Sequence, residues 1–102
     1  MPSKKVTLGF IGAGRVGTGL ASGFARAGVN VVAIASRTIA SAQKLAKRVR
    51  GARACAPQEV ADRADIAFLT VPDDAIEGLA SSLRWRKGAA CVHCSEIGRA
   101  HV

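Results

Sequence analysis

The protein has 102 residues, of which 49% are hydrophobic, 22% are charged and 4% are aromatic, and its net charge is +8. This length fits one domain, the composition excludes a disordered chain, and no apolar run approaches the roughly 18 residues of a membrane span. The first 58 residues contain ten Lys/Arg and no carboxylate, which favours an anionic partner; the alternative is a solvated basic surface.

The chain begins with a predicted strand, helix and second strand. The run VTLGFI at residues 6–11 is apolar and β-branched, which is typical of a strand buried on both faces of a parallel sheet. Apolar residues then recur every four positions from Val16 to Phe24, and Gly28 occupies the position of a helix C-cap. The run VNVVAIA at residues 29–35 is the second predicted strand.

The remaining elements continue the same alternation. They are, in order, a helix at residues 39–49, a weak strand at 52–56, a brief helix opened by Pro57, a strand at 65–71, a helix ending near Leu83 and a strand at 89–94. There are no linkers, repeats or low-complexity tracts. This order predicts an α/β fold of the doubly wound class, with a parallel sheet covered by helices on both faces and truncated after the fifth strand.

A glycine motif of the form G-x-G-x-x-G joins the first strand to the first helix. Its six residues are Gly12, Ala13, Gly14, Arg15, Val16 and Gly17. In this context the motif predicts a dinucleotide site, because the first glycine makes a tight turn, the second lets the backbone approach a pyrophosphate and the third lets helix and strand pack closely. The helix N-terminus adds free N–H groups and a partial positive charge. The alternative is a tight turn with a structural role alone.

The end of the second strand indicates which dinucleotide is bound. A domain that prefers NAD would place Asp or Glu there, about twenty residues past the motif, to hold the ribose 2′-hydroxyl. This chain has Ser36, Arg37 and Thr38 instead. Two hydroxyls and a guanidinium suit a 2′-phosphate, which a carboxylate would repel. We therefore expect NADP rather than NAD; the alternative is a surface arginine without a ligand.

Further candidates lie where the later strands end, because open α/β sheets bind ligands at that edge. They are Thr70, Val71, Pro72, Asp73, His93 and Ser95. The proline could equally shape a turn and the aspartate cap a helix. No residue is identified as a catalytic acid or base. Cys91 and Cys94 match C-x-x-C in spacing, but residues three apart on a strand point to opposite faces, so we expect reduced thiols and no metal site.

Four segments of the chain together resemble the N-terminal half of a family of Rossmann-like oxidoreductases with a helical C-terminal domain: GFIGAGRVGTGLA, VVAIASRT, DIAFLTVPDDAI and VHCS. That family is similar to pyrroline-carboxylate reductases and to 6-phosphogluconate and 3-hydroxyisobutyrate dehydrogenases. The resemblance covers residues 7–95 and implies an NADP-dependent oxidoreductase of a small metabolite. It implies a phosphate loop at Gly12, Gly14 and Gly17 with Arg15 near the pyrophosphate, a 2′-phosphate site at Ser36, Arg37 and Thr38, and a ribose and nicotinamide border at Val71, Pro72 and Asp73.

The resemblance ends after Ser95. In the related dehydrogenases a second domain completes the substrate pocket and the homodimer, so we expect this chain alone to be inactive. The codons ATC GGA AGA GCA CAC GTC of a widely used sequencing adapter translate to residues 97–102. We therefore expect residues 1–95 to form the NAD(P)-binding domain and residues 96–102 to be a non-native tail.

Two functions are left open by the sequence. The first is an NADP-dependent oxidoreductase represented by its cofactor half, and the second is a non-enzymatic nucleotide-sensing Rossmann domain. We expect no nucleic-acid partner, because the basic residues surround a phosphate loop and no aromatic platform accompanies them. Residues 1–13 imitate a short signal peptide, but the glycine loop explains them better, and we expect a cytoplasmic protein without a membrane partner.

Overall fold

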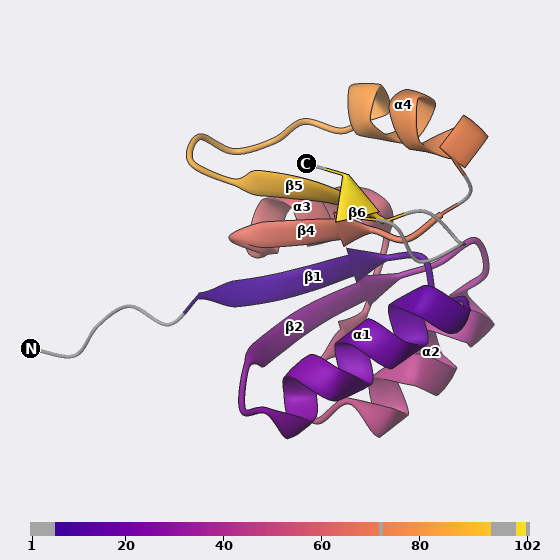
Figure 1. The fold of residues 1–102 in the computed structure, drawn as a ribbon, viewed down its shortest axis with the longest axis vertical. Coiled ribbons are helices and arrows are strands. Elements are labelled where there is room, and N and C mark those ends of the chain that lie inside the picture. Colours follow the sequence, from indigo (N-terminus) through magenta and orange to yellow (C-terminus); the bar gives the residue numbers. More distant parts are fainter. Residues whose placement is uncertain (1–5, 72, 95–99, 102) are drawn as a thin grey trace, which may run out of the picture.

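The computed structural model describes residues 6–71, 73–94 and 100–101, in which strands and helices alternate (Figure 1). The strands are β1 (Thr7–Ile11), β2 (Asn30–Ala35), β3 (Arg53–Ala54), β4 (Ile66–Leu69), β5 (Ala90–Cys94) and β6 (Ala100–His101). The helices are α1 (Arg15–Arg26), α2 (Ile39–Arg48), α3 (Pro57–Arg63) and α4 (Asp73–Ser82). The predicted alternation is therefore confirmed as far as β5.

The strands form one sheet in the order β3-β2-β1-β4-β5-β6. Strands β1 to β5 pair in parallel. Between β3 and β4 the chain crosses from one edge of the sheet to the other side of β1. The carboxyl ends of β1 and β4 therefore meet where the strand order reverses, which is the place where doubly wound sheets bind their ligands. The predicted Rossmann fold class is confirmed.

A sixth strand was not predicted. Strand β6 pairs antiparallel with β5, with His93 opposite His101 and Cys94 opposite Ala100. It comes from the segment that we expected to be a non-native tail and left out of the fold. The free edge of β5 presents unpaired backbone groups, and any nearby extended segment can pair with such an edge without specific side chains.

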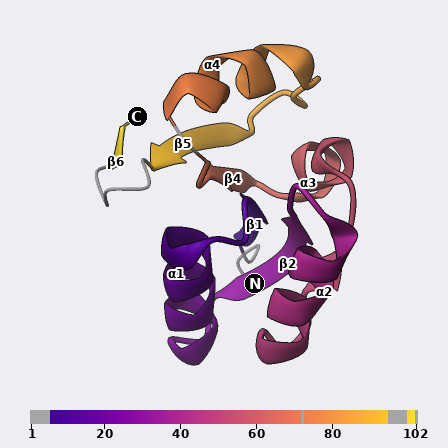
Figure 2. The ribbon, with the colours of Figure 1, turned by 90° about the vertical axis from the view of Figure 1, so that its right-hand side faces the viewer.

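The helices cover the two faces of the sheet in pairs, with α1 and α2 on the side away from α4 (Figure 2). The core beneath α1 and α2 holds all three phenylalanines of the chain. Phe10 and Phe68 stack with ring centroids 5.0 Å apart, and Phe24 of α1 lies 5.5 Å from Phe68. The core beneath α3 and α4 is aliphatic. These two packed layers fix the strand ends from which the site is built.

Strand β4 ends earlier than predicted. It stops at Leu69, so Thr70 and Val71 leave the sheet at its carboxyl edge. Thr70 and Val71 are β-branched and so favour a strand, but the paired residues of β4 end at Leu69, opposite Ile11 and His93. No helix in the described part of the chain is long and apolar enough to cross a membrane.

The amino edge of the sheet is held together by one carboxylate. The N–H of Thr7 in β1 donates to Asp65 Oδ2 at 2.9 Å, and Arg86 forms an ion pair with the same carboxylate. The N–H of Ala90, at the start of β5, donates to the Asp65 carbonyl at 2.9 Å. Asp65, which lies just before β4, thus connects the amino ends of β1, β4 and β5 at the edge of the sheet opposite the glycine loop.

Candidate functional site

The glycine loop leaves β1 through a turn that requires glycine. Gly12 has a φ of +116°, and its N–H donates to the carbonyl of Ala35 at the end of β2 at 2.7 Å. A Cβ on Gly12 would lie 2.3 Å from the carbonyl oxygen of Thr70. Both the backbone conformation and the lack of space therefore exclude a side chain here. The tight turn predicted for this glycine is present.

Close packing around Gly17 locks the loop to α1 and to the end of β4. A Cβ on Gly17 would lie 2.2 Å from the carbonyl oxygen of Gly12 and 2.6 Å from Thr70 Oγ1. The buried Thr70 hydroxyl donates to the Gly12 carbonyl at 2.8 Å and lies 3.3 Å from the Ile11 carbonyl oxygen. Thr70 therefore acts as a clamp that fixes where the loop amides point.

The N-terminus of α1 carries no side-chain cap. Gly14 is the N-cap residue, no side chain there accepts a hydrogen bond from the first turn, and the first turn contains no acidic residue. The first N–H groups of a helix need an acceptor from outside the helix, and together with the helix dipole they favour an anion. The loop and helix end thus present an uncompensated donor surface.

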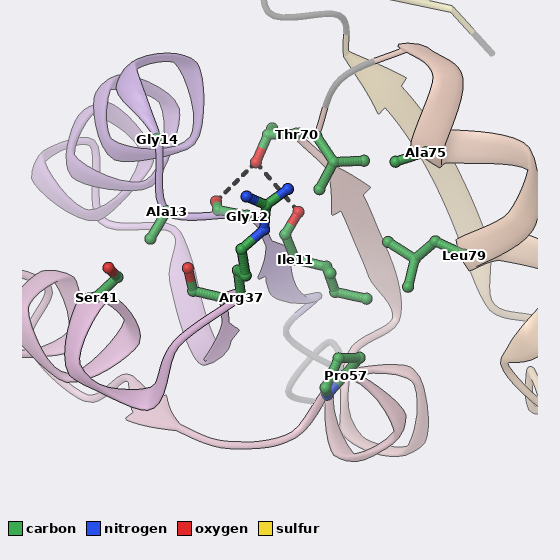
Figure 3. A pocket seen from close by; sticks show the side chains of 12 residues that line it. Ile11, Gly12, Ala13, Gly14, Arg37, Ser41, Pro57, Thr70, Ala75 and Leu79 are labelled. Atoms are coloured by element: carbon green, nitrogen blue, oxygen red, sulfur yellow. Dashed lines mark hydrogen bonds between the residues drawn. The ribbon is translucent and has the colours of Figure 1, made fainter.

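A cavity of about 570 Å³ lies in front of this loop, within the size range of cofactor sites. Its lining residues come from the ends of β1, β2 and β4 and from α2, α3 and α4 (Figure 3). They are Ile11, Gly12, Ala13, Gly14, Ser36, Arg37, Ser41, Pro57, Thr70, Val71, Ala75 and Leu79. Seven of the residues predicted from the sequence are therefore brought together here: Gly12, Ala13, Gly14, Ser36, Arg37, Thr70 and Val71.

The β2–α2 connection supplies the polar side chains of the cavity. Ser36 is half-buried, and the exposed Arg37 extends its guanidinium over the cavity (Figure 3). Thr38 does not line the cavity but caps α2, where its Oγ1 accepts from the Ser41 N–H at 3.2 Å. The same Oγ1 donates to Ser41 Oγ at 3.0 Å. Ser41 lines the cavity where we had expected Thr38.

The other predicted site residues lie outside the lining. Arg15 and Val16 belong to the first turn of α1, and Gly17 packs behind the loop. His93 is half-buried on β5 opposite Leu69. Two predictions, Pro72 and Ser95, lie outside the described residues, and of Asp73 the structure gives only its place as the first residue of α4.

Several lining residues were missed from the sequence. The predicted site omitted Ile11, Ser41, Pro57, Ala75 and Leu79. The proline and Leu79 had been interpreted only as a helix start and a core position. The one signal that could have found Ser41 is its place in the first turn of a helix that begins beside the predicted phosphate residues.

The cavity is suited to binding rather than to proton transfer. Among the described lining residues none is a carboxylate or an imidazole. Its donors are backbone N–H groups, a guanidinium and hydroxyls, whereas Ile11, Val71 and Leu79 give it an apolar wall. Donors suit phosphate groups and an apolar wall suits a flat ring, and a dinucleotide has both.

Neither Cys55 nor Cys91 lines this cavity. Burial raises the pKa of the Cys55 thiol, with a further contribution from Glu59, and burial also raises the pKa of Cys91. Raised pKa values make thiols weaker nucleophiles and weaker metal ligands at neutral pH. Within the described ranges no group of three His, Cys, Asp or Glu could hold a metal ion.

Comparison with known proteins identifies a family and a set of structural neighbours. A family model described as NADP oxidoreductase, coenzyme F420-dependent, matches residues 7–95. A search of curated protein sequences finds no match. Among solved structures, one assigned as an NADP oxidoreductase from Bacteroides fragilis is 31% identical, with a TM-score of 0.80, and the match covers 89% of this chain and 36% of that one.

Two other neighbours are a reductase and a dehydrogenase. An imine reductase variant from Myxococcus stipitatus in complex with NAD+ is 29% identical, with a TM-score of 0.72, and the match covers 89% of this chain and 30% of that one. A 3-hydroxyisobutyrate dehydrogenase from Mycobacterium tuberculosis is 19% identical, with a TM-score of 0.75, and the match covers 90% and 32%. The chain thus spans about a third of the length of the structures that it matches.

Proposed function

The chain belongs to the family of NADP oxidoreductases described as coenzyme F420-dependent, and from this premise we propose that the cavity at the carboxyl edge of its sheet is the NADP site of an oxidoreductase. The observation that carries the proposal is that the glycine loop, fixed by close packing of Gly12 and Gly17 against Thr70, lines the cavity beside the uncapped N-terminus of α1. A glycine loop next to a helix N-terminus without a capping side chain suits a pyrophosphate.

The pyrophosphate would lie against the loop and the uncapped start of α1. Gly12, Ala13 and Gly14 line the cavity there, and the N-terminus of α1 adds its dipole. Arg15 and Val16, in the first turn, would contribute mainly their backbone N–H groups. These groups are common to all dinucleotides, so this half of the site would bind NADP and NAD equally.

Discrimination between the two cofactors would come from the end of β2. Ser36 and Arg37 line the cavity, and Arg37 makes no ion pair within the described residues. A planar guanidinium pairs with phosphate through two parallel hydrogen bonds, which favours the 2′-phosphate of NADP. Thr38 would act by capping α2 and so holding Ser41 in place.

The nicotinamide end would lie at the β4–α4 connection. NADP supplies hydride transfer at its nicotinamide ring when bound. Val71 and Leu79 offer an apolar wall for a ring, and Pro72 and Asp73, which follow Val71 in the sequence, are proposed to border the same ring. His93 and Ser95, at the end of the next strand, are proposed at the border with the substrate. This chain would orient the cofactor, and no proton donor is assigned to it.

The rest of the proposal concerns the whole protein. Its substrate would be a small metabolite, and a helical domain beyond this chain would complete the substrate pocket and a homodimer, so this chain alone would bind cofactor without turnover. We propose a cytoplasmic location. The family match favours the enzyme over a nucleotide-sensing domain. The non-native tail at residues 96–102 stays a prediction, which resequencing of the locus would test.

Calorimetric titration of the purified protein with NADPH and NADH tests the proposal. We expect NADPH to bind about tenfold more tightly or better, because a charge-assisted hydrogen bond to the 2′-phosphate is available only to NADPH. Arg37→Ala should remove most of this difference, whereas Arg26→Ala, in the last turn of α1, should leave it unchanged. Equal affinities in the unmodified protein would contradict the NADP assignment.

A further inference from the structure

A second, smaller cavity lies between α1 and α2 beside the proposed NADP site. Its volume is about 250 Å³, below the size of a cofactor site. The described residues that line it are Ala13, Thr18, Ser41, Lys44, Leu45 and Arg48. Two of them, Ala13 and Ser41, also line the larger cavity, so the two spaces share a wall.

The positive charge that lines the smaller cavity has no acidic partner among the described residues. Lys44 and Arg48 stand one helical turn apart on α2, and neither forms an ion pair within the part of the chain that the structure describes. No acidic residue precedes Glu59 in the sequence, so none lies on α1 or α2. Two like charges at this spacing weaken a helix. A bound anion would remove that repulsion.

Two neutral residues of the smaller cavity, Ser41 and Thr18, contribute a hydroxyl donor and a fixed cavity wall. Ser41 Oγ accepts from Thr38 Oγ1 at 3.0 Å, which leaves the Ser41 proton available to a ligand. The Thr18 hydroxyl donates to the Ala13 carbonyl at 3.3 Å and so holds the shared wall in place. Leu45 is buried beneath the cavity. Two cations and a hydroxyl around a space of this size suit a single phosphate group.

We propose that this cavity is a phosphate-monoester site in which Lys44 and Arg48 bind the 2′-phosphate of the dinucleotide. The inference rests on the proposed function, since it needs NADP in the larger cavity. Arg37 then approaches the phosphate from the β2 side, and Lys44 and Arg48 approach it from α2, with Ser41 between them. A free phosphate ester shares the same chemistry and is the other source of such a group.

Three substitutions on one helix test the proposal. Lys44→Gln and Arg48→Gln remove one charge each from the cavity, and Lys47→Gln removes the same charge from the same helix outside the lining. All three positions are exposed, so the variants should fold, and thermal melting checks this. The probes are NADPH, NADH, 2′-AMP, 5′-AMP and inorganic phosphate, and the readout is the dissociation constant.

We expect Lys44→Gln and Arg48→Gln each to raise the dissociation constants of NADPH and 2′-AMP about fivefold, an effect of the size found for exposed charge pairs. The dissociation constants of NADH and 5′-AMP should not change. Lys47→Gln should change none of them, and Lys44→Arg should retain the preference for NADPH. Loss of phosphate binding without loss of NADPH affinity would assign the site to a free ester and overturn the dinucleotide assignment. Unchanged binding of every probe, with NADPH still preferred over NADH, would overturn the inference but leave the proposed function standing.

Discussion

The two edges of the parallel sheet treat their polar groups in opposite ways. At the amino edge, the Asp65 carboxylate accepts from the Thr7 N–H and pairs with Arg86, so backbone and charge are satisfied within the chain. At the carboxyl edge, the N-terminus of α1 has no capping side chain, and Arg37 has no ion pair among the described residues. The polar groups at the amino edge therefore satisfy one another, whereas the carboxyl edge presents hydrogen-bond donors to a ligand.

This difference separates stability from binding within a single sheet. Groups that satisfy one another stabilise the fold, whereas donors without acceptors at the surface are available to a ligand. The glycine loop belongs to both categories, because its packing against Thr70 is tight while Gly12, Ala13 and Gly14 line the cavity. Substitutions at the two edges should therefore affect stability and cofactor affinity in different proportions.

The largest effect is expected at Gly17. In Gly17→Ala the new Cβ would meet the Gly12 carbonyl oxygen at 2.2 Å, so the loop must move. We expect a loss of stability of about 1–3 kcal/mol, as for overpacking, together with loss of dinucleotide binding. Denaturant unfolding and NADPH titration measure the two effects.

Gly23→Ala is the matched control on the same helix. A Cβ there meets nothing within 4 Å, so removal of a helical glycine should stabilise the protein by up to about 1 kcal/mol and leave NADPH affinity unchanged. If the two alanine variants behave alike, the clamp does not position the loop.

The next effect is expected at the amino edge. Asp65→Ala removes the acceptor for the Thr7 N–H and the partner of Arg86. We expect the free energy of unfolding to fall by about 1–3 kcal/mol, while the NADPH affinity of the folded protein stays the same. Glu77→Ala, exposed on α4, should change stability by less than about 0.5 kcal/mol. An Asp65 variant with normal stability but weakened NADPH binding would reverse the roles assigned to the two edges.

A smaller effect is expected at the clamp hydroxyl. Thr70→Val removes the donor to the buried Gly12 carbonyl, at a cost of about 1–2 kcal/mol. Because the loop is proposed to contact the pyrophosphate that both cofactors share, the binding of NADPH and the binding of NADH should weaken together. Thr70→Ser should restore binding of both. A change in the ratio of the two affinities would place Thr70 at the 2′-phosphate instead.

The smallest effect concerns the thiols. Burial raises the pKa of Cys55 and Cys91 above the ordinary 9.0, so at pH 8 both should hold less thiolate and react more slowly with a disulfide reagent than free cysteine does. The rate should continue to rise as the pH passes 9. A Cys94→Ser background confines the readout to these two residues, and reaction as fast as that of free cysteine would contradict the burial.

The local part of the site could be predicted from the sequence. The glycine spacing, the strand before it and the absence of an acidic residue at the end of β2 are properties of short segments, and the structure places Gly12, Ser36 and Arg37 around one cavity. Backbone conformation and helix starts depend mainly on neighbouring residues. For this reason the five parallel strands could be predicted as well.

The tertiary part could not be predicted. The place of Thr70 on the rim could be predicted, but its hydrogen bond to the Gly12 carbonyl depends on the pairing of β4 beside β1. Thr38 caps α2 instead of lining the cavity as expected, and Ser41, for which no role was predicted, lines the cavity in its place. The pairing of β6 with the edge of β5 depends on proximity rather than on sequence pattern.

The most direct test of the division between the two edges is a ¹⁵N-resolved NMR titration of the protein with NADPH. We expect saturable shift changes at the backbone amides of Gly12, Gly14 and Arg37, with the amides of Thr7 and Asp65 unmoved. Shift changes centred on the amino edge, or none that saturate at the glycine loop, would contradict the assignment of the carboxyl edge as the cofactor site.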